Sequence, residues 1–131
     1  MSGEEAVVAA IRMLTFRAWR EHHHYLGLEE LLTSLEPLIE TYEWRLTIDW
    51  LIPAIEMPEN IWLSTDQVLQ LFGSHPQLVD GEAEGRRVGS SATDVRLRAL
   101  DSSLWDVQTA RPDVAVRISE LYPDAVELKE W

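Results

Sequence analysis

The sequence predicts an α+β fold, a single-domain sandwich with two or three helices on one face of a mainly antiparallel or mixed sheet. Several segments alternate apolar and polar residues with the period of two that is typical of strands. Other segments carry apolar residues at the three- and four-residue spacing of a helix. The chain has 131 residues, 46% of them hydrophobic, which suffices for one core, so we assign residues 1–131 to one domain.

The strand predictions rest on alternation. The expected strands are 11–19, which AVVAA at 6–10 can extend, 44–52, the two arms of a hairpin over 94–109, and 125–131. In the second strand, Trp44 and Trp50 fall on the apolar face, and Pro53 ends the strand. Asp101, Ser102 and Ser103 supply the turn of the hairpin.

The helix predictions rest on apolar spacing and on capping residues. The expected helices are 28–42, 65–73 and 112–122. Pro37 should kink the first helix or begin a new one. Residues 74–93 contain three glycines and little apolar periodicity, so we expect a long loop or a weak hairpin there, partly mobile.

Charge and composition exclude several classes of function. The formal net charge of −12 argues against binding to nucleic acid or to anionic membranes and permits a basic protein partner. The chain has no cysteine, which rules out thiolate chemistry and fits a cytoplasmic protein. Glu4 and Glu5, followed by a short apolar run, do not resemble a secretion signal, which also favours the cytoplasm.

The run EHHHYLGLEEL at residues 21–31 is the one candidate metal site. On an extended chain, His22 and His24 share a face, and Glu21 or His75 could complete a site for zinc or another divalent metal. The alternative, a solvated polar loop between a strand and a helix, is the interpretation we favour, and it implies no cofactor.

No set of catalytic residues stands out. No serine lies in a nucleophile motif, and the glycine-rich stretch GEAEGRRVGS lacks the lysine and the strand-to-helix context of a phosphate loop. Asp49 lies in the middle of a strand, where we favour a cross-strand ion pair with Arg17, Arg96 or Arg98 over a catalytic role. A non-enzymatic protein is therefore the preferred prediction.

Arginines and tryptophans give the candidate binding residues. Arg17, Arg45, Arg96 and Arg98 all fall on the polar faces of their predicted strands. If the strands are neighbours, these arginines form an anion or acidic-partner site; the alternative, which we favour, is a ladder of ion pairs with Asp49, Asp106 and Glu127.

The chain has six tryptophans, which is many for its length. Trp44, Trp50 and either Trp62 or Trp105 are expected in the core. Exposed tryptophans are typical of protein-binding hot spots, so Trp19 and Trp105 join the candidate partner-binding residues.

Residues 97–128, LRALDSSLWDVQTARPDVAVRISELYPDAVEL, carry one resemblance. Within about the last forty residues, this run resembles the strand–turn–strand–helix–strand of small uncharacterised bacterial proteins, some of which look like immunity proteins of polymorphic toxin systems. The resemblance rests on Asp101, Ser102 and Ser103 followed by Trp105 and Val107. It implies an acidic, cytosolic, single-domain protein without catalytic residues.

Together these observations predict a non-enzymatic, acidic bacterial interaction protein, an immunity-like inhibitor that binds a basic protein partner. The alternative is a metal-binding protein or metal-dependent enzyme that uses the loop His22–His24. A homodimer is compatible with either hypothesis, because the last strand could pair across a two-fold axis.

Overall fold

The structure is a computed structural model that describes residues 11–73 and 76–131, so the proposed extension at 6–10 lies outside it. The strands are β1 (Arg12–Arg17), β2 (Trp19–Arg20), β3 (His24–Tyr25), β4 (Tyr42–Ile52), β5 (Trp62–Ser64), β6 (Gln77–Arg87), β7 (Val95–Leu100), β8 (Leu104–Thr109) and β9 (Val126–Glu127). The helices are α1 (Leu28–Ser34), α2 (Thr65–Phe72) and α3 (Pro112–Leu121).

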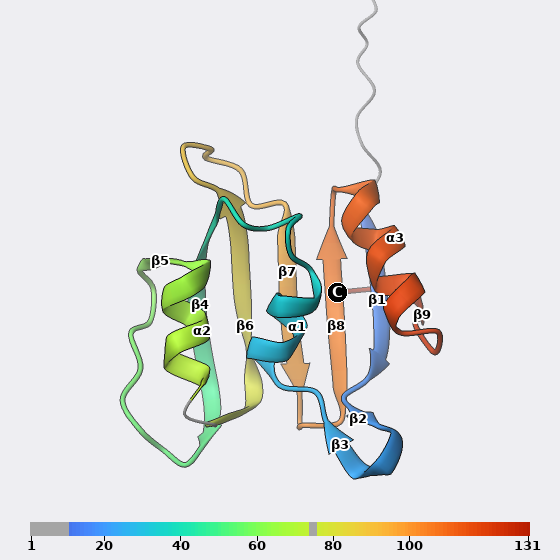
Figure 1. Ribbon diagram of the computed structural model, residues 1–131, viewed down its shortest axis with the longest axis horizontal. Coiled ribbons are helices and arrows are strands. Elements are labelled where there is room, and N and C mark those ends of the chain that lie inside the picture. Colours follow the sequence, from blue (N-terminus) through green and yellow to red (C-terminus); the bar gives the residue numbers. More distant parts are fainter. Residues whose placement is uncertain (1–10, 74–75) are drawn as a thin grey trace, which may run out of the picture.

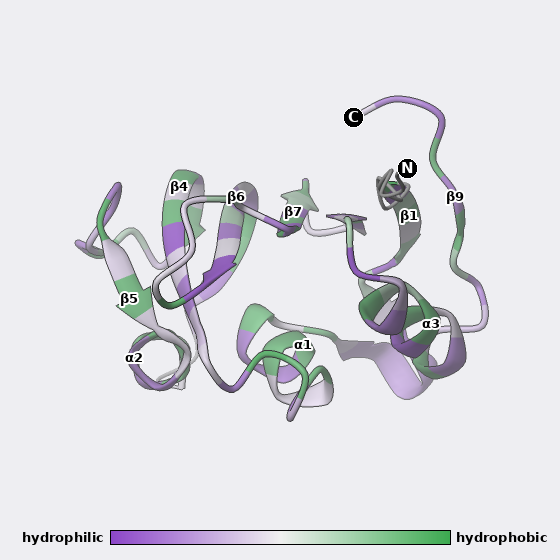
Figure 2. Ribbon diagram, turned by 90° about the horizontal axis from the view of Figure 1, so that it is seen from above, coloured by the Kyte–Doolittle hydropathy of each residue, from purple (hydrophilic) through white to green (hydrophobic). Residues whose placement is uncertain are grey.

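Seven strands form one open sheet in the order β5-β4-β6-β7-β8-β1-β9, and every neighbouring pair is antiparallel (Figure 1). All three helices lie on one face of this sheet, and the other face, which we call the open face, carries no helix (Figure 2). The predicted α+β class and single domain are confirmed. No helix in the described residues is long and apolar enough to cross a membrane.

The core lies between the sheet and the helices and includes two buried indoles. Trp44 donates its ring N–H to Thr65 Oγ1 over 2.8 Å, and Trp105 donates its own to the backbone oxygen of Leu26, also over 2.8 Å. A buried indole N–H needs such an acceptor, because an unpaired polar group is costly in the core. The two bonds therefore hold the sheet to α2 and to the chain that enters α1.

Several predicted elements are confirmed. The hairpin β7–β8 turns at Asp101 and Ser102, both with positive φ, and α3 begins at Pro112 as expected. Ser64 caps α2 in a capping box with Gln67, in which each side chain binds the backbone N–H of the other residue. The last strand, β9, is shorter than predicted and has only two residues.

The predicted loop over 74–93 is wrong for residues 77–87, which form β6, an inner strand of the sheet. After Leu78 and Val79 at its start, its buried positions are small: Gly81, Ala83 and Gly85. A Cβ on Gly85 would lie 2.4 Å from the ring of Trp44, so only glycine leaves room for that indole. The strand alternates small and charged residues, and a search for large apolar residues misses this pattern.

The core position predicted for Trp50 is also wrong. The register between β4 and β6 shifts around Trp50, where Ile48 pairs with Gly81 but Trp50 pairs with Asp80. Such a bulge inserts one residue and turns the following side chains to the other face. Leu51 is buried in place of Trp50, whose side chain is 50% exposed.

The first helix ends earlier than its apolar pattern predicts. α1 stops at Ser34, and residues 35–41 form turns before β4 begins. Pro37 accounts for the stop, because a proline disfavours helical geometry at the preceding residue and cannot donate a backbone hydrogen bond. Leu35 and Ile39 are nonetheless fully buried, so the apolar spacing reports burial rather than helix.

Arg111 joins α3 to the turns before β4. Its guanidinium donates to Leu38 O over 2.6 Å and to Tyr42 Oη over 3.0 Å. The same group pairs with Asp113 at 2.6 Å, and the Tyr42 hydroxyl donates to Asp94 Oδ1 over 2.6 Å. Because the side chain of Arg111 is mostly buried, these bonds are well shielded from water.

Gly85→Ala should destabilise the protein by about 1–3 kcal/mol, the usual cost of overpacking a core. At an unconstrained position the same change would stabilise the protein slightly, because alanine lowers the entropy of the unfolded chain. Urea unfolding measures the difference in the free energy of unfolding, and the m-value should be the same for the variant and the wild type. Equal or higher stability of the variant would contradict the contact between Gly85 and Trp44.

Arg111→Met should destabilise the protein by about 2–3 kcal/mol at neutral pH, because it leaves Leu38 O without its charged donor. The hydrogen bond from Arg111 lowers the pKa of Asp113. Asp113 therefore stabilises the fold above its unfolded pKa of about 3.9, and this contribution is lost as the pH falls through its lower folded pKa.

That contribution should stay below about 1 kcal/mol, because the Asp113 side chain is half exposed. NMR titration of the Asp113 carboxyl checks the direction: its pKa should be higher in Arg111→Met than in the wild type. An identical pKa in the two proteins would refute the pairing.

Candidate functional site

The open face of the sheet brings together the charged residues of the central strands. Residues that pair directly across antiparallel strands project to the same face. One row across the sheet therefore contains Arg45 of β4, Glu84 of β6 and Arg96 of β7. Arg45 Nη2 lies 2.8 Å from Glu84 Oε1, and Arg96 Nη2 lies 3.4 Å from Glu84 Oε2. The single carboxylate of Glu84 thus holds an arginine on each side.

A second row runs through Thr47, Glu82, Arg98, Asp106 and Thr15, on five successive strands. Asp106 is only 2% exposed, and its Oδ2 accepts a hydrogen bond from Arg98 Nη2 over 2.9 Å. Within the described residues, Thr15 Oγ1, Arg98 Nε and Asp106 Oδ1 are buried without a hydrogen-bond partner. The part of the row from Arg98 to Thr15 therefore has polar atoms that solvent does not reach.

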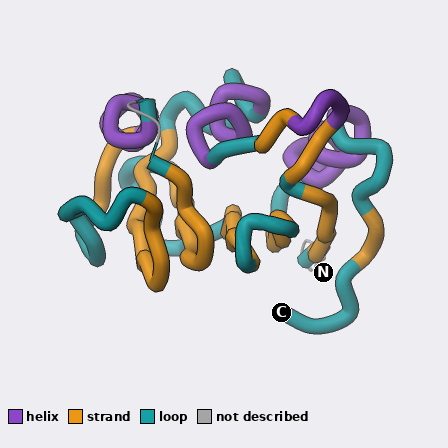
Figure 3. Tube along the Cα trace, turned by 90° about the horizontal axis from the view of Figure 1, so that it is seen from below, coloured by secondary structure: helices purple, strands orange, loops and turns teal. Residues whose placement is uncertain are grey.

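Two tryptophans stack on the arginines of this face. The guanidinium carbon of Arg86 lies 3.7 Å from the centre of the Trp62 ring, while Arg86 Nε pairs with Glu43 at 2.7 Å. Arg98 lies 3.9 Å from the centre of the Trp131 ring. Trp131 reaches this place because the chain after β9 turns back across the side of the sheet opposite to the helices (Figure 3). Each stacked arginine is also paired with a carboxylate, so its charge is neutralised and its side chain is fixed.

Between these groups the open face contains a hollow of about 460 Å³. Its charged lining residues are Asp49, Asp80, Glu82, Glu84, Arg96 and Arg98. Four carboxylates against two guanidinium groups give the hollow an excess of negative charge. Within the described residues the Asp49 side chain has no hydrogen-bond or ion-pair partner, whereas Asp80 accepts a bond from Asp101 N over 2.7 Å. The hollow thus presents a free carboxylate to solvent.

The carboxyl group of Glu82 is the one whose ionisation this environment changes most clearly. Burial raises its pKa, and the neighbouring charge of Glu84 raises it further, against the attraction of Arg96 and Arg98. The contact with Arg96 is loose, with Arg96 Nε 3.6 Å from Glu82 Oε2. A cation entering the hollow would therefore find Glu82 incompletely paired.

The predicted binding residues divide between this face and other places. Arg45, Arg96, Arg98 and Asp49 meet on the open face, and Arg98 pairs with Asp106 as the predicted ladder requires. Asp49, by contrast, pairs with none of the arginines. The carboxylates Glu82 and Glu84 were missed, because their strand was predicted to be a loop; the alternation of EAEGRR was the available signal.

Three other predicted residues lie away from the hollow. Arg17 pairs with Asp124 at 3.7 Å at the far side of the sheet. Trp19 is 49% exposed on the β2–β3 hairpin and packs against Tyr25. Trp105 is fully buried, so its ring cannot meet a partner at the surface, which corrects that prediction. Its position opposite Phe16 in the sheet places it on the helix side.

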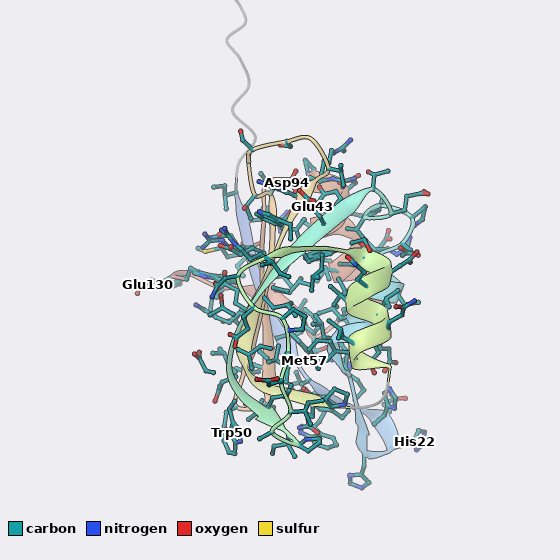
Figure 4. The ribbon with its side chains drawn as sticks, turned by 90° about the vertical axis from the view of Figure 1, so that its left-hand side faces the viewer. His22, Glu43, Trp50, Met57, Asp94 and Glu130 are labelled. Carbon is teal, nitrogen blue, oxygen red and sulfur yellow. The ribbon has the colours of Figure 1, made fainter. Side chains whose placement is uncertain are left out.

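The histidine run lies at the turn of the β2–β3 hairpin, where His22 and His23 have positive φ. His24 Nε2 lies 2.7 Å from Glu30 Oε1, which gives this imidazole a partner of its own. Among residues 11–73 and 76–131, no three histidine, aspartate or glutamate side chains converge as metal ligands, Glu21 included, and His75 lies outside those residues. His22 projects from the end of the hairpin, on the other side of the molecule from Trp50 (Figure 4).

Comparison with known proteins identifies no relative: no protein-family model, no curated protein and no solved structure matches this chain.

Arg96→Met should raise the pKa of Glu82 further, because it removes the attraction that opposes the effect of burial. A carboxyl whose folded pKa is raised stabilises the fold below its unfolded pKa and loses that contribution as the pH rises through the folded value. The variant should therefore lose more stability than the wild type as the pH rises above the unfolded pKa of glutamate, about 4.3. NMR titration of the Glu82 carboxyl measures whether its pKa rises in Arg96→Met. The control is Arg12→Met on β1, which should leave the pKa of Glu82 unchanged.

Proposed function

We propose that this protein is a non-enzymatic binding protein whose open face receives a basic protein partner. The observation that carries the proposal is the hollow, in which four carboxylates outnumber two arginines on the sheet face that no helix covers. Opposite charge across an interface selects partners and speeds their encounter. The net charge of −12 also attracts a basic partner over a longer range.

The ladder of ion pairs supports a binding role, because it organises the face before a partner arrives. Individually, exposed ion pairs add little stability. Here, however, Glu84 and Asp106 hold Arg45, Arg96 and Arg98 in rows. Trp62 and Trp131 stack on two of these arginines, Arg45 and Arg98. Side chains that are already ordered lose less entropy on binding, so a preorganised face binds more tightly than a mobile one.

The proposed partner is one that the protein inhibits, in the manner of the immunity proteins that the C-terminal run resembles, and the proposed location is the cytoplasm. An inhibitor of this kind needs no catalytic residue: it needs a surface complementary to a basic partner, and the open face has that character.

Asp49→Asn should weaken binding of a basic probe at low salt, because it removes the free carboxylate of the hollow. The probe is a blocked peptide of four Gly-Lys repeats, followed by ¹H–¹⁵N NMR. In the wild type, the amides that shift should lie in β4, β6 and β7. Asp49→Asn should raise the Kd about two- to fivefold, the loss of one partly screened charge pair.

Glu120→Gln is the matched control, since it removes the same charge from an exposed position on α3, on the helix side. It should leave the Kd of the peptide nearly unchanged. Equal weakening by Asp49→Asn and Glu120→Gln, or shifts spread over the helices, would mean that only the net charge attracts the peptide and would refute the open face as the site.

A further inference from the structure

The bulge in β4 places an indole and carboxylates together at the edge of the hollow. Trp50 pairs across the strands with Asp80, which lines the hollow, so both residues belong to the open face. Asp49 is the inserted residue of the bulge and lines the same hollow. Figure 4 shows Trp50 pointing away from the helices at one end of the sheet. A bulge interrupts the regular backbone hydrogen bonds between two strands, and at this position it also exposes a large aromatic ring.

The same face contains three examples of an aromatic ring, a guanidinium group and a carboxylate in contact. Arg86 stacks on Trp62 and pairs with Glu43. Arg45 lies 4.8 Å from the centre of the same Trp62 ring and pairs with Glu84. Arg98 stacks on Trp131 and pairs with Asp106. The ring attracts the flat face of the guanidinium while the carboxylate binds its edge, so the two contacts support each other.

Trp50 has the ring and the carboxylates of this arrangement but lacks the cation. Among the described residues, no arginine or lysine stacks on Trp50, and no aromatic ring packs against it. Asp49 has no partner within the same residues. The half-exposed indole and the free carboxylate are therefore both available to an incoming side chain.

We infer that Trp50, with Asp49 and Asp80, binds an arginine side chain of the protein partner, stacked on the indole and paired with the carboxylates. This inference rests on the proposed function and names the group that the partner contributes. Charge complementarity selects a cation, because the hollow has an excess of carboxylates. The indole selects arginine over lysine, because a planar, weakly hydrated guanidinium stacks on an aromatic ring better than an ammonium group does.

The experiment compares two blocked peptides of equal length and charge, four Gly-Arg repeats and four Gly-Lys repeats, by calorimetry and by ¹⁹F NMR of protein labelled with 5-fluorotryptophan. The wild type should bind the arginine peptide about two- to tenfold more tightly than the lysine peptide, the ratio that a stacked guanidinium supplies. The Trp50 resonance, assigned by its loss in Trp50→Leu, should shift more with the arginine peptide.

Trp50→Leu should bring the ratio of the two affinities close to one while the lysine peptide still binds. The matched control is Trp19→Leu, since Trp19 is 49% exposed against 50% for Trp50 but lies on the β2–β3 hairpin. The control should keep the wild-type ratio. Both side chains are half exposed, and an unchanged ¹H–¹⁵N spectrum away from the site verifies folding.

The outcomes separate this inference from the proposed function. If the lysine peptide binds in the hollow but the wild type shows no preference for arginine, the inference is overturned and the proposed function stands. The inference is equally overturned if Trp50→Leu keeps the preference or Trp19→Leu loses it. If neither peptide binds, both proposals fall.

Discussion

The contact between Trp44 and the flat inner side of β6 determines how the sheet is assembled. The indole lies where any side chain on Gly85 would have to be, and its N–H is bound by Thr65 at the start of α2. The Thr65 hydroxyl in turn lies within hydrogen-bond distance of the carbonyl oxygens of Ile39 and Tyr42. One buried ring therefore connects β4, β6, α2 and the turns before β4. Because β6 joins the β4–β5 side of the sheet to the β7–β8–β1 side, the whole sheet depends on this packing.

The small residues on the inner side of β6 alternate with charged residues on its outer side. Alternation places Glu82, Glu84 and Arg86 on the open face, opposite charged residues of the neighbouring strands. The resulting rows satisfy most of the charges among themselves, and Trp62 and Trp131 stack on arginines of this face. What is left in the middle is a hollow with a surplus of carboxylates. The face is therefore polar and ordered, a combination that suits recognition of a charged partner more than burial against another apolar surface.

The bulge at Asp49 and Trp50 divides β4 into two parts with different roles. Before the bulge, Trp44 and Leu46 point into the core and Arg45 belongs to the ladder. After it, the inward position passes to Leu51, and Trp50 joins the open face. A regular strand would have buried Trp50 and hidden the aromatic ring from any partner. The irregularity thus moves an aromatic ring from the core side of the sheet to the open face.

The local pattern by itself determined the class of the fold and the elements whose signals are local: the alternation of β1, β4 and the β7–β8 hairpin, the capped helix α2, and Pro112 at the start of α3. It also identified Arg45, Arg96, Arg98 and Asp49 as members of a polar strand face, because alternation assigns faces without knowledge of strand order.

Tertiary structure alone decided the rest, because the deciding contacts join residues far apart in the chain. Gly85 is required in its strand only because the ring of Trp44 occupies the space where a side chain would lie. Trp50 is exposed only because the register shifts against Asp80. Trp131 stacks on Arg98 only because the chain after β9 crosses the sheet. Spacing in the sequence reports which face a residue takes, but which residues meet on that face depends on strand order and register, and packing sets both.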